Sequence, residues 1–164
     1  MINVKKILYA TDFSPHSNQA YFHAIALAEG HGASLTIVHV FAPASARPVV
    51  IGDTISPVVN FNPEEREYWR GQLEQIRPVN PDIAVEHVLL EGDPAEEIIQ
   101  YATDAHIDLI VMGTHGRTGL ERLLMGSVAE KVLRGAPCSV LVVKLQKRTQ
   151  TEAEKERVAQ AAYS

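Results

Sequence analysis

The chain has 164 residues, with 15 basic and 20 acidic side chains and a net charge of −5. This acidic balance argues against a general nucleic-acid binder, which usually presents a basic face, and no run of about 18 or more apolar residues predicts a membrane span. The single cysteine, Cys138, cannot form an internal disulfide, and no signal-peptide pattern opens the sequence, so we expect one cytoplasmic domain.

The first part of the sequence alternates strand and helix patterns. Residues 6–10 (KILYA) form a short apolar run that predicts a strand, and Asp12 follows it closely. Ser14 and Pro15 then predict an N-cap and the first residue of a helix. Residues 34–41 (SLTIVHVF), rich in branched side chains, predict the second strand.

A long connection follows the second strand. Residues 42–62 contain three prolines, and a connection of this length is typical of a functional lid, a partner surface or partial disorder. After it, Pro63 is expected to begin a helix that continues to about residue 76. Residues 83–90 (IAVEHVLL) predict the third strand.

The remaining elements complete an alternating pattern. Residues 93–96 (DPAE) predict a capped helix start, and residues 108–112 (DLIVM) and 139–143 (SVLVV) predict the fourth and fifth strands. Five strands separated by helices favour an α/β fold, in which a mostly parallel five-stranded sheet is covered by helices on both faces. If the strands run in the order 3-2-1-4-5, this order reverses between the first and fourth strands, and a ligand crevice opens there.

The segment between the fourth strand and the next helix, residues 113–127 (GTHGRTGLERLLMGS), holds Gly113, Gly116 and Gly126 at fixed offsets. A strand, a loop and a helix start bring unpaired backbone N–H groups and the positive end of a helix dipole to one place, which suits an anion. Glycine is expected there because it reaches positive φ and lets the backbone approach oxygen atoms closely. The assumed strand order also brings Asp12 to face Gly113 across the crevice.

These motifs resemble a known family. The segment ATDFS (residues 10–14), the VHV of the second strand and the pattern G-2x-G-9x-G-[ST] over residues 113–127 are similar to the nucleotide-binding branch of the universal stress protein (UspA) superfamily. The likeness implies a universal stress protein domain over residues 1–144, of flavodoxin-like or Rossmann-like fold (adenine nucleotide alpha hydrolase-like). It also implies ATP as ligand, often with Mg²⁺ or Mn²⁺ at the phosphates, and a homodimer formed through the last strand, residues 139–143. The tail, residues 145–164, lies outside the pattern and is expected to be helical or disordered.

The resemblance also implies a nucleotide site. Asp12 would accept hydrogen bonds from the ribose hydroxyls, and Val40 would offer backbone groups to the adenine. Glycines and the start of the last helix would hold the phosphates through backbone N–H groups and the Ser127 hydroxyl, and no side chain is expected to bind the metal directly. The expected nucleotide-binding set is Ala10, Thr11, Asp12, Val40, Met112, Gly113, His115, Gly116, Arg117, Gly126, Ser127 and Val128.

Several of these residues have alternative interpretations. Asp12 would also suit the approach to the first helix, although Ser14 already provides a cap, and Ser127 would serve as an N-cap as well as a phosphate donor. His115 is expected to stabilise its loop or to face a partner rather than act as a general base. Arg117 is balanced between a contact with the γ-phosphate and a solvated charge.

Three function classes follow. The first is a regulatory module whose partner or oligomer preference shifts with ATP occupancy. The second is a slow ATPase or phosphotransfer enzyme, against which the sequence lacks a GxxxxGK[ST] motif. The third is a nucleotide-free dimeric scaffold, against which the glycine pattern weighs. An apolar final strand at a sheet edge favours pairing with a second copy, and higher assembly through the tail stays open.

Overall fold

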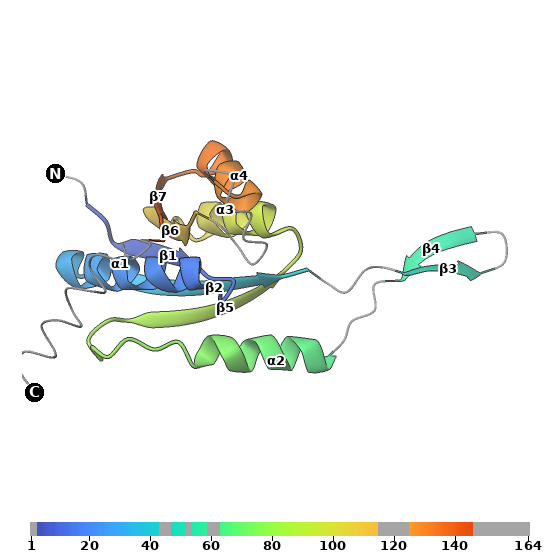
Figure 1. Ribbon diagram of the computed structural model, residues 1–164, viewed down its shortest axis with the longest axis horizontal. Helices are drawn as coiled ribbons and strands as arrows, with labels where there is room; N and C mark the ends of the chain where they lie inside the picture. Colours follow the sequence, from blue (N-terminus) through green and yellow to red (C-terminus); the bar gives the residue numbers. More distant parts are fainter. Residues whose placement is uncertain (1–2, 43–46, 52–53, 59–62, 115–124, 146–164) are drawn as a thin grey trace, which may run out of the picture.

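The main sheet has five parallel strands (Figure 1). The computed structural model describes residues 3–42, 47–51, 54–58, 63–114 and 125–145. Every neighbouring pair in the main sheet is parallel, in the order β5-β2-β1-β6-β7. Its strands are β1 (Lys6–Ala10), β2 (Ser34–Phe41), β5 (Val85–Glu91), β6 (Leu109–Gly113) and β7 (Ser139–Val143). The predicted order 3-2-1-4-5 is confirmed, because β5, β6 and β7 are the third, fourth and fifth strands of this sheet.

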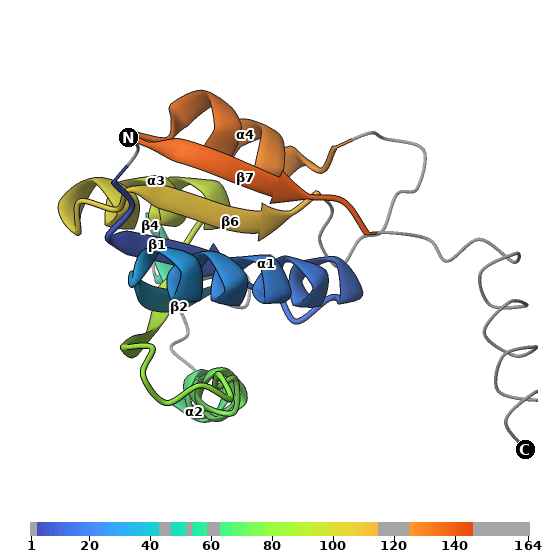
Figure 2. The same cartoon turned by 90° about the vertical axis from the view of Figure 1, so that its left-hand side faces the viewer.

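Helices cover both faces of the sheet (Figure 2). One apolar cluster joins the inner sides of α1 (Pro15–His31) and α2 (Pro63–Glu74) to the face that carries Tyr9 and Ile37. A second cluster joins α3 (Pro94–Asp104) and α4 (Ser127–Gly135) to the opposite face. Side chains alternate between the two clusters along each strand, as expected for a sheet buried on both sides.

The first helix begins as the sequence predicts. Ser14 is the N-cap of α1, with its hydroxyl accepting a hydrogen bond from the Ser17 N–H at 3.3 Å, and Pro15 is the first helical residue. The Tyr9 hydroxyl donates to the Ser17 carbonyl at 2.8 Å, which ties the start of α1 to β1. Burial raises the pKa of Tyr9 to about 12, so this phenol stays protonated and keeps donating at neutral pH.

At the amino edge of the sheet, a carboxylate connects the starts of β1 and β6. Asp108, directly before β6, accepts hydrogen bonds at one oxygen from the Lys5 N–H at 2.8 Å and the Lys6 N–H at 2.9 Å. These two backbone donors hold the pKa of Asp108 below its usual range. The contact fixes the start of β6 beside the start of β1, and so fixes the two strands between which the strand order reverses.

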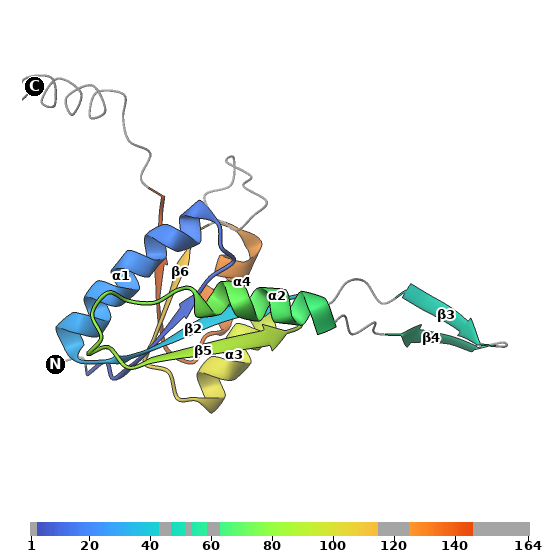
Figure 3. The ribbon, with the colours of Figure 1, turned by 90° about the horizontal axis from the view of Figure 1, so that it is seen from below.

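The long connection contains a hairpin that the sequence reading did not predict. Strands β3 (Arg47–Ile51) and β4 (Thr54–Val58) form a two-stranded antiparallel sheet, which projects beyond the body of the protein (Figures 1 and 3). Each strand contains a proline, which is rare inside a sheet, but both strands of such a ribbon are edges, where proline is tolerated. The two-residue spacer of sequence Gly-Asp was the hairpin signal in the sequence.

Two further predictions concern the C-terminal tail and membrane-spanning helices. Residues 146–164 lie outside the described residues, so the prediction for the tail stays a prediction. No helix in the described ranges combines the length and the apolar character that a membrane crossing requires.

Candidate functional site

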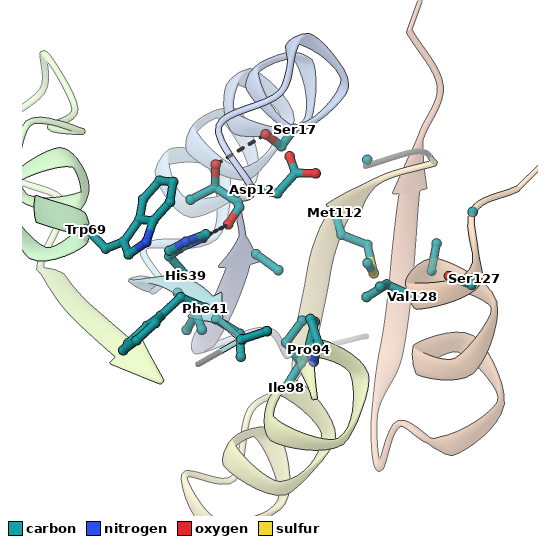
Figure 4. A pocket seen from close by; sticks show the side chains of 18 of the residues that line it. Asp12, Ser17, His39, Phe41, Trp69, Pro94, Ile98, Met112, Ser127 and Val128 are labelled. Carbon is teal, nitrogen blue, oxygen red and sulfur yellow. Dashed lines mark hydrogen bonds between the residues drawn. The ribbon is translucent and has the colours of Figure 1, made fainter. Parts of the chain in front are cut away.

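A cavity of about 490 Å³ opens at the carboxyl edge of the sheet, where β1 and β6 separate (Figure 4). Its size falls within the roughly 300–1,000 Å³ typical of small-ligand pockets. All the predicted site residues that the structure describes line it, and they are Ala10, Thr11, Asp12, Val40, Met112, Gly113, Gly126, Ser127 and Val128. The other three, His115, Gly116 and Arg117, lie outside the described residues.

The turn after β1 brings a carboxylate to this cavity. The Thr11 N–H donates to the Val38 carbonyl at 2.9 Å, which extends the β1–β2 pairing by one residue. Asp12 then accepts a hydrogen bond from the Ser14 N–H at 2.9 Å through one carboxylate oxygen. Asp12 therefore does serve the approach to α1, and the same half-buried side chain also lines the cavity.

The backbone of Val40 faces the space beyond β1. Pairing between β1 and β2 ends at Ala10 and Val38, apart from the Thr11 bond to Val38. On the other side of β2, the Phe41 carbonyl accepts from the Gly92 N–H at 3.2 Å. Because backbone groups two residues apart on a strand point to the same side, the N–H and C=O of Val40 lie on the side of β2 where β1 has already ended.

The start of α4 forms the opposite wall and differs from the sequence prediction. Gly126 is the N-cap, with φ −74° and ψ 158° and no side-chain hydrogen bond, and the helix begins at Ser127. The expectation that Ser127 is the N-cap is therefore wrong, and its side chain is exposed beside the cavity instead. The Gly126 N–H donates to the Thr114 carbonyl at 2.6 Å, and the Thr114 N–H donates to the Val143 carbonyl at 3.0 Å. These bonds join the helix start to the ends of β6 and β7.

The expected reason for the glycines also needs correction. Within the described residues, positive φ occurs in glycine only at Gly32 and Gly92, so neither Gly113 nor Gly126 is required by a left-handed conformation. A Cβ at Gly113 would lie 2.8 Å from both the carbonyl carbon and the carbonyl oxygen of His16, so this glycine allows the first turn of α1 to pack on β6. Gly126 has an extended backbone that any residue adopts, so a left-handed conformation does not explain glycine there.

The far end of the cavity is apolar and aromatic, and the sequence reading did not assign it. Phe41 of β2, Trp69 of α2, and Pro94 and Ile98 of α3 line this end. No local sequence pattern predicts that these four residues line one cavity. They come together only because α2 and α3 pack on opposite faces of the sheet at β2. In the part of the protein that the structure describes, no group of three or more His, Cys, Asp or Glu side chains is placed to hold a metal ion.

His39 of β2 also lines the cavity. Its side chain is buried, and its Nδ1 is 2.8 Å from the Thr11 carbonyl oxygen. Because a carbonyl only accepts, Nδ1 is the protonated nitrogen of this ring. His39 thus supports the turn that carries Asp12.

The sequence profile of the universal stress protein family matches residues 3–144. This chain belongs to that family. It is 36% identical over 155 residues to the universal stress protein MJ0531 of Methanocaldococcus jannaschii, with 88% of this chain and 84% of the relative covered. The universal stress protein MJ0577 of the same organism superposes with a TM-score of 0.69 at 28% identity, covering 89% of this chain and 99% of that protein.

Two more distant universal stress proteins share the fold and carry adenine nucleotides. One was solved in complex with cAMP, with a TM-score of 0.62 at 21% identity and coverage of 87% of this chain and 98% of that protein. The other, from Archaeoglobus fulgidus, was solved in complex with dAMP, with a TM-score of 0.62 at 21% identity and coverage of 88% and 100%.

Proposed function

We propose that this universal stress protein binds ATP in the cavity between β1 and β6 and acts as a nucleotide-dependent regulatory module. The observation that carries the proposal is the meeting of three complementary groups in one pocket: a carboxylate at Asp12, outward backbone groups at Val40, and a helix start at Gly126 that has no capping side chain. A ribose, a purine edge and a phosphate chain need these three kinds of partner.

The distribution of polarity orients the ligand. Adenine fits the apolar end near Val40 and Ile98, the ribose lies at Asp12, and the phosphates lie at the start of α4. There the amides of the first helical turn and the helix dipole favour an anion. Mg²⁺ or Mn²⁺ would be held through the phosphates, since Mg²⁺ keeps several of its waters and binds substrate phosphates. His115, Gly116 and Arg117 lie outside the described residues, so their roles stay predictions: Gly116 at the phosphates, Arg117 at the γ-phosphate or in solvent, and His115 in its loop or at a partner.

The nucleotide that copurifies with the protein tests this proposal. Protein prepared without added nucleotide is denatured, and the supernatant is separated against nucleotide standards. Adenine nucleotide is expected in the wild type and is expected to be lost in Gly126→Val, because a side chain would occupy phosphate space. Gly71→Val on the exposed side of α2, where a Cβ meets nothing within 4 Å, is the matched control. Equal nucleotide content in wild type and Gly126→Val would count against the site.

The ribose contact has its own test. Asp12→Asn keeps an oxygen that accepts from Ser14, so the turn is retained, but it removes the charge that strengthens a hydrogen bond from a hydroxyl. We expect the wild type to prefer ATP over 2′-deoxy-ATP in calorimetric titration, and the variant to lose about tenfold in ATP affinity and most of that preference. An unchanged preference would remove Asp12 from the ribose site.

The same preparations separate the alternative functions. Phosphate release above background that is lost in Gly126→Val would indicate a slow ATPase, and a wild type without nucleotide affinity would indicate a dimeric scaffold. We further propose a homodimer formed by antiparallel pairing of β7, which is the last strand of the main sheet among the described residues. Light scattering of Val140→Pro, which removes a backbone donor from β7, tests this arrangement.

A further inference from the structure

The residue directly after Asp12 has an unusual backbone. Phe13 has φ of +63°, a left-handed conformation that is uncommon for a residue with a bulky side chain. Such conformations persist only where the surroundings fix them, and they concentrate at ligand sites and switches. Phe13 does not line the cavity itself, whereas Asp12 does.

Two rings from other elements hold Phe13. Its ring stacks on that of Trp69 of α2, with centroids 5.6 Å apart and planes inclined by 13°, and lies 4.7 Å from the ring of His39 of β2. His39 and Trp69 also contact one another, with centroids 4.7 Å apart. The three side chains form an aromatic clamp, defined here as Phe13, His39 and Trp69.

Hydrogen bonds connect the aromatic clamp to the turn. His39 Nδ1 donates to the Thr11 carbonyl at 2.8 Å, and the Phe13 N–H donates to the Thr11 hydroxyl at 3.0 Å. The Thr11 hydroxyl also lies 3.2 Å from that of Ser17 (Figure 4). Both neighbours of Asp12 are therefore fixed, one by a buried histidine and the other by ring packing against α2.

We propose that Trp69 is a positioning residue for the nucleotide site: by clamping Phe13 in its left-handed conformation, it orients the Asp12 carboxylate toward the ribose. This inference rests on the proposed nucleotide function. It couples the docking of α2 to nucleotide affinity, and coupling of this kind is reciprocal. Bound nucleotide stabilises the docked α2, and a partner that pulls α2 from the sheet weakens nucleotide binding.

A pair of Phe13 variants separates the backbone from the ring contacts. Phe13→Ala and Phe13→Gly both remove the ring, but only glycine adopts positive φ without a steric cost. We expect calorimetric ATP affinity to fall about tenfold in Phe13→Ala and to recover to within about threefold of wild type in Phe13→Gly. Equal losses in the two variants would overturn the inference, since they would show that the conformation of the turn does not determine affinity.

Variants of α2 test the role of Trp69 directly. We expect Trp69→Phe, which keeps a stacking ring, to retain ATP affinity within about threefold, and Trp69→Leu to lose about tenfold. Because Trp69 also lines the cavity, Trp69→Leu is measured in the Phe13→Gly background as well, where a residue that acts through Phe13 should cause little further loss. Arg70→Leu is the matched control, because Arg70 is an exposed residue of the same helix that does not line the cavity and pairs with Glu67 on the surface. An equal loss in Arg70→Leu would trace the effect to the stability of α2 and would overturn the inference.

Fluorescence gives a second readout. The protein has one tryptophan, which belongs to the aromatic clamp and also lines the cavity, so its emission reports both the clamp and the bound ligand. At saturating ATP we expect a shift in wild type that is smaller in Phe13→Ala. A wild type that binds no adenosine nucleotide would contradict the proposed function. A wild type that binds ATP with no change in emission, and with affinity indifferent to Trp69→Leu, would contradict only the positioning role.

Discussion

Helices α1, α3 and α4 begin at the same edge of the sheet, but they do not begin in the same way. Ser14 caps α1 with its hydroxyl, and Asp93 caps α3 by accepting from the N–H groups of Ala95 and Glu96 at 3.1 Å each. Helix α4 begins after Gly126, which brings no side chain to its first amides. At two of these helices the N-cap side chain satisfies the first donors, and at the third those donors suit an external anion.

The difference shows how one edge can serve both stability and binding. A capping side chain contributes about 0.5–2 kcal/mol relative to alanine but only a few tenths relative to glycine, so Gly126 costs α4 little stability while it leaves the first amides without a capping side chain. Because Gly126 has an ordinary extended backbone, local conformation does not demand glycine there. The proposed nucleotide site would supply a reason, because a bare helix start offers room and donors for an anion. Four substitutions test this contrast between capped and uncapped helix starts. They lie at both kinds of helix start, at the second glycine of the cavity and at the opposite edge of the sheet.

A charged cap at the start of α4, which has no capping side chain, should have the largest effect on ATP affinity. Gly126→Asp gives α4 the kind of cap that α3 has, so thermal unfolding should be unchanged or slightly higher. The added carboxylate repels phosphates, and we expect ATP affinity in calorimetry to fall at least about a hundredfold. Gly71→Asp, which adds the same charge on the exposed side of α2, should bind normally. Retained affinity in Gly126→Asp would place the phosphates elsewhere.

The other glycine at the cavity should affect folding instead. Gly113→Ala places a Cβ 2.8 Å from backbone atoms of His16, which cannot rotate away. We expect a loss of about 1–3 kcal/mol in the free energy of unfolding, measured with urea. Gly71→Ala, at a helical position with open space around the Cβ, should instead gain up to about 1 kcal/mol. A Gly113→Ala protein of normal stability would show that α1 shifts easily on β6.

Removing an existing cap should cost stability without changing binding. Asp93→Ala deletes both hydrogen bonds to the first turn of α3, and we expect the free energy of unfolding to fall by about 1 kcal/mol. The ion pair between Asp93 and Lys131, at 3.7 Å on the surface, adds little to this loss. ATP affinity should remain that of wild type. A drop in affinity comparable to that of Gly126→Asp would mean that capped and open starts both contribute to the site.

The smallest effect belongs to the opposite edge of the sheet and depends on pH. The folded-state pKa of Asp108 is lowered by two backbone donors, so its charge contributes stability above the unfolded-state value near 3.8. That contribution is lost as the pH falls through the lower folded-state pKa. Asp108→Asn should therefore be less stable than wild type at neutral pH, by less than Asp93→Ala, and the difference should vanish in acid unfolding. A constant difference at all pH values would contradict this account.

Much of the fold could be predicted because its signals are local. The Ser14-Pro15 helix start, the Asp93 cap and the strand from Ser139 to Val143 all depend on residues within a few positions of one another. Helical and strand periodicities also act over short windows. The hairpin of β3 and β4 escaped prediction because its prolines obscured a short-range signal.

The sequence by itself determined the five strands of the main sheet, the family and nine of the residues that line the cavity, because caps, apolar runs and glycine spacing are local features of the sequence. The tertiary structure decided how these residues pack. Only packing showed that Gly113 makes room for α1 whereas Gly126 leaves α4 open. Only packing placed Trp69 against Phe13, because contacts between distant segments depend on how helices settle on the sheet, which no local pattern encodes.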